Sequence, residues 1–137
     1  MKRPSAVNIL KEAEAAGWDA YENHTPTPMN VVQHSNPLDD NSPVVQSWHV
    51  SEGACGFAWI TVPGNTWFIR ELKKFGKASA DINCWDSDVV FKPAYRGGYQ
   101  YWVGGGQSIE RKEAFARAFS DVLSKYDIKN YTGSRLD

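Results

Sequence analysis

Cys55 is the side chain of this sequence with the clearest capacity for covalent chemistry, because a cysteine thiolate is a strong nucleophile. Small residues surround it in Gly53-Ala54-Cys55-Gly56, and they would let a substrate backbone approach. A nucleophilic cysteine needs a base, and the histidine expected on an adjacent strand is His49. His49 precedes Cys55, whereas small cysteine peptidases usually place the histidine after the cysteine. We therefore interpret Cys55 as a packed thiol and keep Cys55 with His49 as the alternative, catalytic interpretation.

Two further patterns could hold a metal ion or a phosphate, and neither has the required spacing. The candidate metal ligands are three histidines and two aspartates: His24, His34, His49, Asp39 and Asp40. No pair among them shows the spacing of a known ligand motif. The glycine-rich loop 104–108 lacks the lysine of a phosphate-binding loop, and Glu110 would repel an anion there. We expect no metal and no cofactor.

Composition limits the classes of partner. The net charge of −1 argues against a nucleic-acid binder, which normally shows a basic excess. No apolar run approaches the roughly 18 residues that cross a membrane. The two cysteines, Cys55 and Cys84, are too few for a disulfide scaffold and are typical of reduced thiols in a cytosolic protein. A single domain of 137 residues is expected.

Residues 55–62 predict a strand that is apolar on both faces. With a period of two, one face carries Ala58, Ile60 and Val62. The other face carries Phe57, Trp59 and Thr61. A strand that is exposed on one side should alternate apolar and polar residues, so a chain segment, a partner or a ligand must cover the second face.

A second aromatic strand is expected after the turn Arg96-Gly97-Gly98, which predicts a hairpin between residues 88–95 and 99–103. The run Tyr99-Gln100-Tyr101-Trp102 loosely resembles the aromatic third strand of RNA-recognition motifs. The additional Gly98 and the acidic charge balance count against that function. Packing of these aromatic side chains inside the protein remains the simpler interpretation.

Helical periodicity predicts three helices, over residues 6–16, 66–75 and 109–126. Gly17 is expected to end the first, and the third should bury Phe119 and expose Lys112 on its opposite face. Residues 131–136 would form a final strand. Residues 55–137 then read as βαββαβ, which predicts an α+β fold of the ferredoxin-like sandwich type.

The N-terminal part, residues 1–50, is expected to add the first helix and an extended arm to this core. Four prolines interrupt regular structure between residues 22 and 47. A strand is expected only after them, at residues 46–50. Apolar residues such as Met29 and Val31 are scattered through the arm. We expect residues 24–45 to lie across the sheet face that bears Phe57 and Trp59.

Four groups of short segments remain: Thr25-Pro26-Thr27-Pro28-Met29, Gly53-Ala54-Cys55-Gly56-Phe57-Ala58-Trp59, Gln107-Ser108 with Lys112-Glu113-Ala114, and Gly133-Ser134-Arg135-Leu136-Asp137. Taken together, they resemble a group of short tailed-bacteriophage proteins that has no established activity. The resemblance spans about residues 25–137. It implies a phage origin and a location in the cytoplasm of the bacterial host.

These observations predict a small phage accessory protein that is not a catalyst and acts by protein–protein interaction. Its partner would be a host or phage protein, or a second copy in a homodimer. The expected contact residues are aromatic: Trp48, Phe57, Trp59, Tyr99, Tyr101 and Trp102. Two alternatives stay open, namely single-stranded nucleic-acid binding on an aromatic sheet face and a cysteine-dependent enzyme that uses Cys55.

Overall fold

The structure is a computed structural model that describes residues 4–34, 38, 44–50 and 53–137, with the backbone alone for residues 29–34 and 44–50. Three helices and six strands follow one another along the described chain. They are α1 (Ala6–Asn23), β1 (Met29–His34), β2 (Val44–Val50), β3 (Gly56–Val62), α2 (Trp67–Lys74), β4 (Lys92–Pro93), β5 (Tyr99–Trp102), α3 (Ile109–Lys125) and β6 (Tyr131–Leu136).

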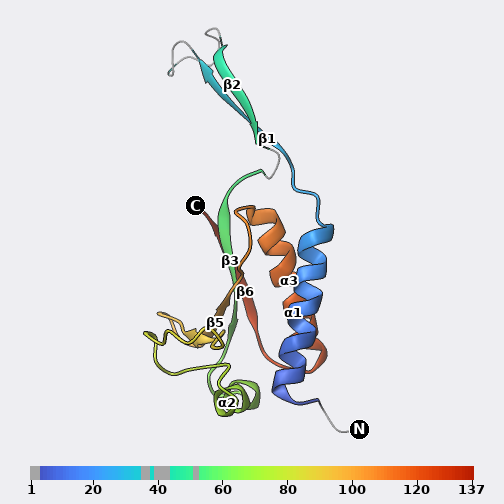
Figure 1. The fold of residues 1–137 in the computed structure, drawn as a ribbon, viewed down its shortest axis with the longest axis vertical. Helices are drawn as coiled ribbons and strands as arrows, with labels where there is room; N and C mark the ends of the chain where they lie inside the picture. Colours follow the sequence, from blue (N-terminus) through green and yellow to red (C-terminus); the bar gives the residue numbers. More distant parts are fainter. Residues whose placement is uncertain (1–3, 35–37, 39–43, 51–52) are drawn as a thin grey trace.

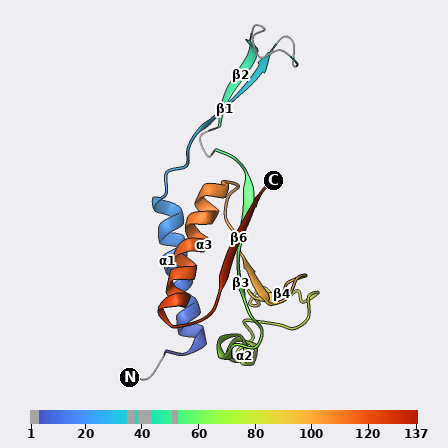
Figure 2. The same ribbon diagram turned by 180° about the vertical axis from the view of Figure 1, so that it is seen from behind.

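A four-stranded antiparallel sheet in the order β4-β5-β3-β6 forms the centre of the molecule. Helices α1 and α3 lie side by side on one face of it (Figures 1 and 2). Helix α2 lies beyond one end of the sheet, so neither face carries it. The fold is therefore α+β, as the sequence predicts.

The hydrophobic core lies between this sheet and the two long helices. Strand β3 contributes Ala58, Ile60 and Val62, which are almost completely buried, and α3 contributes Phe115 and Phe119. Helix α1 contributes four buried residues: Ala6, Ile9, Leu10 and Ala13. The N-terminal helix is thus a structural part of the core, where we expected an addition to it.

Helix α1 runs seven residues beyond its expected end at Ala16. Gly17 does not terminate it, because it is buried against the ring of Phe115 on α3. A Cβ atom at this position would lie 2.7 Å from Cε2 of that ring. Glycine serves here as the close-contact residue between two helices, and α1 continues through residues 18–23.

The segment expected to cover the sheet forms a separate two-stranded hairpin. Strands β1 and β2 pair antiparallel, from Met29 with Val50 to His34 with Val44. Both views show this hairpin projecting from one end of the molecule, away from the four-stranded sheet. For the described residues of the arm the expectation of a cover is wrong, because β1 pairs with β2 and not with the sheet. Residues 35–37 and 39–43 of the expected arm lie outside the described residues. The two segments that connect the hairpin to the rest of the protein lie close together. A Cβ on Gly53 would be only 2.5 Å from the Thr27 carbonyl oxygen.

The turn before β5 agrees with the predicted hairpin. Ala94 N–H donates to the Gly98 carbonyl, and Gly97 N–H donates back to Ala94. Gly97 and Gly98 both have positive φ, which residues with a side chain rarely adopt. The strand before the turn is only two residues long, much shorter than predicted.

Helix α3 begins as expected, because the Ser108 hydroxyl accepts a hydrogen bond from Arg111 N–H. Lys112 is buried, contrary to our expectation of an exposed position. Its Nζ donates to the Gly56 carbonyl oxygen at 3.1 Å, which satisfies the charged group beside the start of β3. The lysine thereby ties α3 to the sheet.

Candidate functional site

The face of the sheet turned away from α1 and α3 is the candidate site, and we call it the outer face. Strand register places nine residues on it: Phe57, Trp59, Thr61, Lys92, Gln100, Trp102, Tyr131, Gly133 and Arg135. Trp59 lies opposite both Trp102 of β5 and Gly133 of β6. The outer face therefore spans all four strands of the sheet.

Three aromatic rings on the outer face pack against one another. The Trp59 and Trp102 ring centroids are 4.9 Å apart, and those of Phe57 and Trp102 are 6.3 Å apart in an edge-to-face arrangement. Trp102 is still 49% exposed. Mutual contact holds these rings in place, and side chains that are already ordered lose less conformational entropy when a surface binds a ligand.

Gly133 determines where the Trp59 indole lies. A Cβ at Gly133 would be 2.5 Å from the indole Nε1 and 2.6 Å from Cε2. The ring therefore lies flat over the backbone of β6, in the space that any other residue would fill. Replacement of this glycine would displace Trp59 from the outer face.

A hollow of about 620 Å³ lies on this face beside the rings. Trp59, Thr61 and Gln100 form its floor, and the turn of residues 94–98 forms one wall. Arg96 is the charged residue of its lining. The hollow thus offers a planar apolar surface next to a cation, which suits an aromatic or other flat group that carries a negative charge.

Arg135 and Lys92 are further cations on the outer face. The guanidinium carbon of Arg135 lies 5.4 Å from the centroid of the Phe57 ring, within cation–π range. Arg135 and Arg96 are both exposed. Stacking and ion pairing are the chemistry that this arrangement provides.

Two of the predicted contact residues point the other way. Tyr101 is buried in the core, 4.7 Å from Phe119 between ring centroids, and its hydroxyl donates to Glu14 at 2.9 Å. Burial and the neighbouring Glu14 carboxylate raise the pKa of Tyr101 far above its ordinary value of 10.0. Tyr99 lies on the same face as Tyr101 and packs against the core. Neither tyrosine belongs to the outer face.

The other predicted contact residues divide as follows. Phe57, Trp59 and Trp102 are brought together on the outer face. Trp48 and His49 lie on strand β2 of the projecting hairpin, and their side chains are outside the described residues. The proposed pairing of Cys55 with His49 is therefore untested.

Cys55 lies just before β3, at a shallow hollow of about 180 Å³. Its thiol donates to the side-chain oxygen of Gln107 at 3.3 Å. His24, whose side chain is described, contacts Glu110 instead of a cysteine. The described partner of the Cys55 thiol is therefore an amide, and His24 does not contact it.

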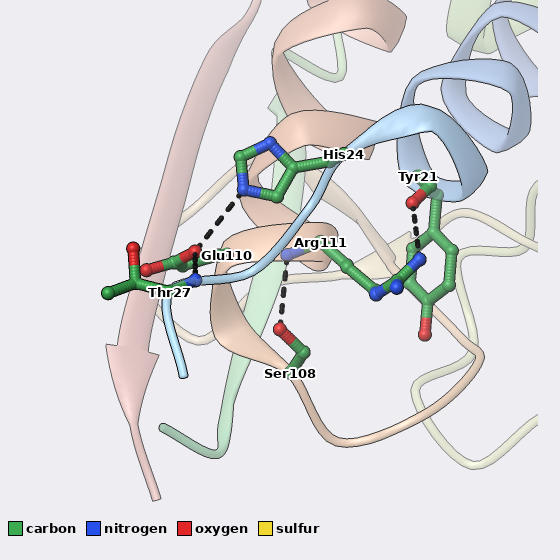
Figure 3. A network of polar contacts seen from close by, with 6 residues as sticks. All are labelled: Tyr21, His24, Thr27, Ser108, Glu110 and Arg111. Atoms are coloured by element: carbon green, nitrogen blue, oxygen red, sulfur yellow. Dashed lines mark hydrogen bonds and ion pairs between the residues drawn. The ribbon is translucent and has the colours of Figure 1, made fainter. Parts of the chain in front are cut away.

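A polar network fixes the segment that leads into the hairpin (Figure 3). The Glu110 carboxylate accepts a hydrogen bond from Thr27 N–H at 2.7 Å and lies 3.3 Å from Nε2 of His24. The Thr27 hydrogen bond, followed by the His24 contact, lowers the pKa of Glu110 from its ordinary 4.5. Arg111 donates to the Tyr21 carbonyl at 3.1 Å. The first turn of α3 thus holds the end of α1 and the root of the hairpin.

The glycine-rich loop before α3 also has an internal partner. Gly106 N–H donates to the Tyr21 hydroxyl at 2.7 Å, so this backbone donor is occupied by the protein itself. Over the residues that the structure describes, no group of three or more His, Cys, Asp or Glu side chains is arranged to hold a metal ion. In the same residues, no helix combines the length and apolar character needed to span a membrane.

Sequence reasoning missed the contributions of β6 and of the turn to the outer face. Tyr131, Gly133 and Arg135 alternate along the predicted final strand, and this alternation was a usable signal. Arg96 was assigned to a turn without regard to the surface that the turn flanks. Comparison with protein-family models, with curated proteins and with solved structures finds no match to this chain.

Proposed function

We propose that this protein is a non-catalytic interaction protein that binds a protein partner on its outer face. The observation that carries the proposal is the cluster of Phe57, Trp59 and Trp102, packed together and left open on a sheet face that no long helix covers. Protein interfaces are enriched in tryptophan, tyrosine and arginine, and these are the residue types gathered here. A phage accessory role in the bacterial cytoplasm, as the resemblance implies, is part of the proposal.

The lining of the outer face specifies the partner's chemistry. The hollow accepts one or two apolar or aromatic side chains, and Arg96 and Arg135 favour a carboxylate beside them. An aromatic pair contributes about 0.5–1.5 kcal/mol beyond the area that it buries. A short partner segment that combines an aromatic residue with an acidic residue is the expected ligand.

Alanine variants of exposed tryptophans test this function. Immobilised wild-type protein is compared with Trp102→Ala as bait for host or phage proteins, identified by mass spectrometry. The matched control is Trp85→Ala, because Trp85 is 95% exposed and does not line the outer-face hollow. We expect a partner that wild type and Trp85→Ala retain and Trp102→Ala loses. Identical sets of proteins on all three baits would contradict the proposal.

Single-stranded nucleic-acid binding is the second candidate, and the position of the aromatic residues favours it. Phe57 and Trp59 lie on one central strand and Trp102 on the other, which is where RNA-recognition motifs stack bases. Arg96 and Arg135 could contact the backbone phosphates. The net charge of −1 weighs against this function, because it provides no general attraction for a polyanion.

A titration distinguishes this second candidate. Labelled single-stranded oligonucleotides of mixed sequence are added to wild type and Trp102→Ala at two salt concentrations. Loss of one stacked base, worth about 1–3 kcal/mol, would weaken binding by roughly 5- to 150-fold. Binding that is absent, or equal in both proteins, would exclude the outer face as a nucleic-acid site.

We also propose that residues 55–137 form a ferredoxin-like sandwich with a shortened first helix. The strand order β4-β5-β3-β6 and the antiparallel direction of every pair support this assignment. The connecting helix α2 has eight residues and lies beyond the end of the sheet, and α1 packs beside α3 in its place.

A further inference from the structure

The two edges of the four-stranded sheet differ in how they are protected. Strand β4 is two residues long and contains Pro93, which has no N–H to offer a neighbouring strand. Strand β6 is six residues long, contains no proline, and pairs on one side with β3. Among the described strands, none pairs with its other side.

Backbone hydrogen bonds show which groups of β6 face this open edge. Asp137 N–H donates to the Cys55 carbonyl at 3.1 Å, whereas Val103 N–H donates to the Ala58 carbonyl at 3.0 Å. Because bonding direction alternates along an antiparallel strand, odd-numbered residues of β6 bond to β3. The N–H and C=O groups of Thr132, Ser134 and Leu136 therefore point to the open edge.

We propose that a second copy of this chain occupies the edge, with its β6 antiparallel to the first and the two-fold axis at Gly133. The proposal goes beyond the interaction function proposed above, because the second copy pairs with the edge of β6 and does not enter the hollow beside Arg96. Thr132 then bonds to Ser134 of the second copy, and Asn130 to its Leu136, each pair occurring twice. On the outer face, Tyr131 lies opposite Arg135 of the second copy, a cation–π pair that also occurs twice.

Gly133 suits the position on the axis. Residues that face each other there form a non-hydrogen-bonded pair, in which the strands approach most closely. Gly133 has no side chain, and the Trp59 indole lies over it. The two Trp59 rings would meet across the axis and join both outer faces into one surface. A register centred on Ser134 would place Arg135 opposite Gly133 and lose the pairs with Tyr131.

The helical layer supplies complementary charge at the same place. Glu113 and Arg117 of α3 flank a hollow of about 210 Å³ between the helix and β6, next to Thr132, Gly133 and Ser134. Glu113 accepts a hydrogen bond from the Ser134 hydroxyl at 2.8 Å, so it lies at the edge itself. The proposed register pairs Ser134, which Glu113 contacts, with Thr132 of the second copy, which lines the same hollow as Arg117. Glu113 would therefore face Arg117 of the second copy, and the two-fold axis repeats this contact.

Sedimentation equilibrium of the full chain at micromolar concentration tests the proposal. Wild type is expected to have twice the mass of one chain. Ser134→Pro removes one outward N–H and leaves the bonds to β3 intact, so its dissociation constant should rise at least tenfold. Ser134→Ala is the matched control, because it loses the hydroxyl but keeps the N–H, and it should remain a dimer. Far-ultraviolet circular dichroism confirms that each variant is folded.

Charge exchange provides a second test that does not depend on proline. Glu113→Arg and Arg117→Glu should each weaken the dimer, and the double variant should restore it. Register is tested by mild oxidation of a mixture of Tyr131→Cys and Arg135→Cys proteins. The mixture should form a disulfide between positions 131 and 135, located by peptide mapping, that neither protein forms alone.

Two results would overturn the inference. One is a wild-type monomer at these concentrations. The other is a dimer whose dissociation constant neither Ser134→Pro nor the charge variants change. The proposed function is tested separately, by whether Trp102→Ala still retains the partner protein. Trp102 lies two strands away from the β6 edge, so this substitution does not alter the strand pairing between the two copies. A dimer that retains no other protein would support self-pairing as the interaction itself.

Discussion

Substitution of Gly17 by alanine sets two known effects against each other inside one helix. Alanine stabilises a helix interior by about 0.5–1 kcal/mol relative to glycine. The new Cβ, however, would lie 2.7, 2.8 and 2.9 Å from Cε2, Cδ2 and Cγ of Phe115. Phe115 is fully buried and contacts Trp18 and Tyr101, so its ring has little room to retreat. Overpacking of this kind costs about 1–3 kcal/mol.

We therefore expect Gly17→Ala to lower the free energy of unfolding by about 1–2 kcal/mol, measured by urea unfolding followed by circular dichroism. Ala15→Gly is the matched control, because Ala15 is exposed on the same helix and reports propensity alone. In a Phe115→Leu background the smaller side chain should relieve the overlap, and Gly17→Ala should become neutral or stabilising. A gain of the full 0.5–1 kcal/mol in the wild-type background would refute the close helix contact.

Three further outcomes follow from the core and the polar network. Phe119→Ala should lower the free energy of unfolding, measured in urea, by about 3–5 kcal/mol, because this fully buried ring contacts Tyr101 and Phe115. A loss below about 1 kcal/mol would place the ring outside the core. Lys112→Ala should lower the free energy of unfolding by about 1–3 kcal/mol, since it removes a buried charged donor from the Gly56 carbonyl. As the control, Lys11→Ala at an exposed position should change it by less than about 0.5 kcal/mol. Equal urea midpoints for the two variants would contradict the buried contact. The lowered pKa of Glu110 means that its contact with Thr27 is fully present above pH 4.5 and is lost as the pH falls through the folded-state value. The exchange protection of the Thr27 amide should fall over that range and should be low at neutral pH in Glu110→Ala; protection that is independent of pH would show that Glu110 does not hold the hairpin root.

The sequence predicts the elements of the C-terminal part better than the contacts between them. Capping residues and periodicity locate α2, α3, β3 and β6, because these signals are local. Both faces of β3 are apolar, so alternation alone could not decide that the aliphatic face is buried and the aromatic face is open. Gly17 resembles a terminator in sequence, and only the neighbouring Phe115 ring explains why the helix continues.

Two other predictions, for Lys112 and for the residues of β1, are wrong because contacts between distant parts of the chain decide the structure there. Lys112 carries a charge that normally indicates an exposed helix face, but the Gly56 carbonyl satisfies it in a buried place. The residues of β1 were assigned to an arm because prolines interrupt the region, whereas strand pairing between distant segments decides their structure. Of the candidate site, alternation groups Phe57 with Trp59 and separates Trp102 from Tyr101, but the register of β5 against β3 was needed to place Trp102 on the same face as Trp59.

The closeness of Thr27 and Gly53 has an evolutionary consequence. A segment that leaves and re-enters the body at one point can be exchanged, lengthened or removed without separating any strands of the central sheet. Substitutions between these two residues thus escape the constraint that a shared core imposes on the remainder of the chain. Selection can accordingly change the hairpin with less restraint than the folded body that carries it.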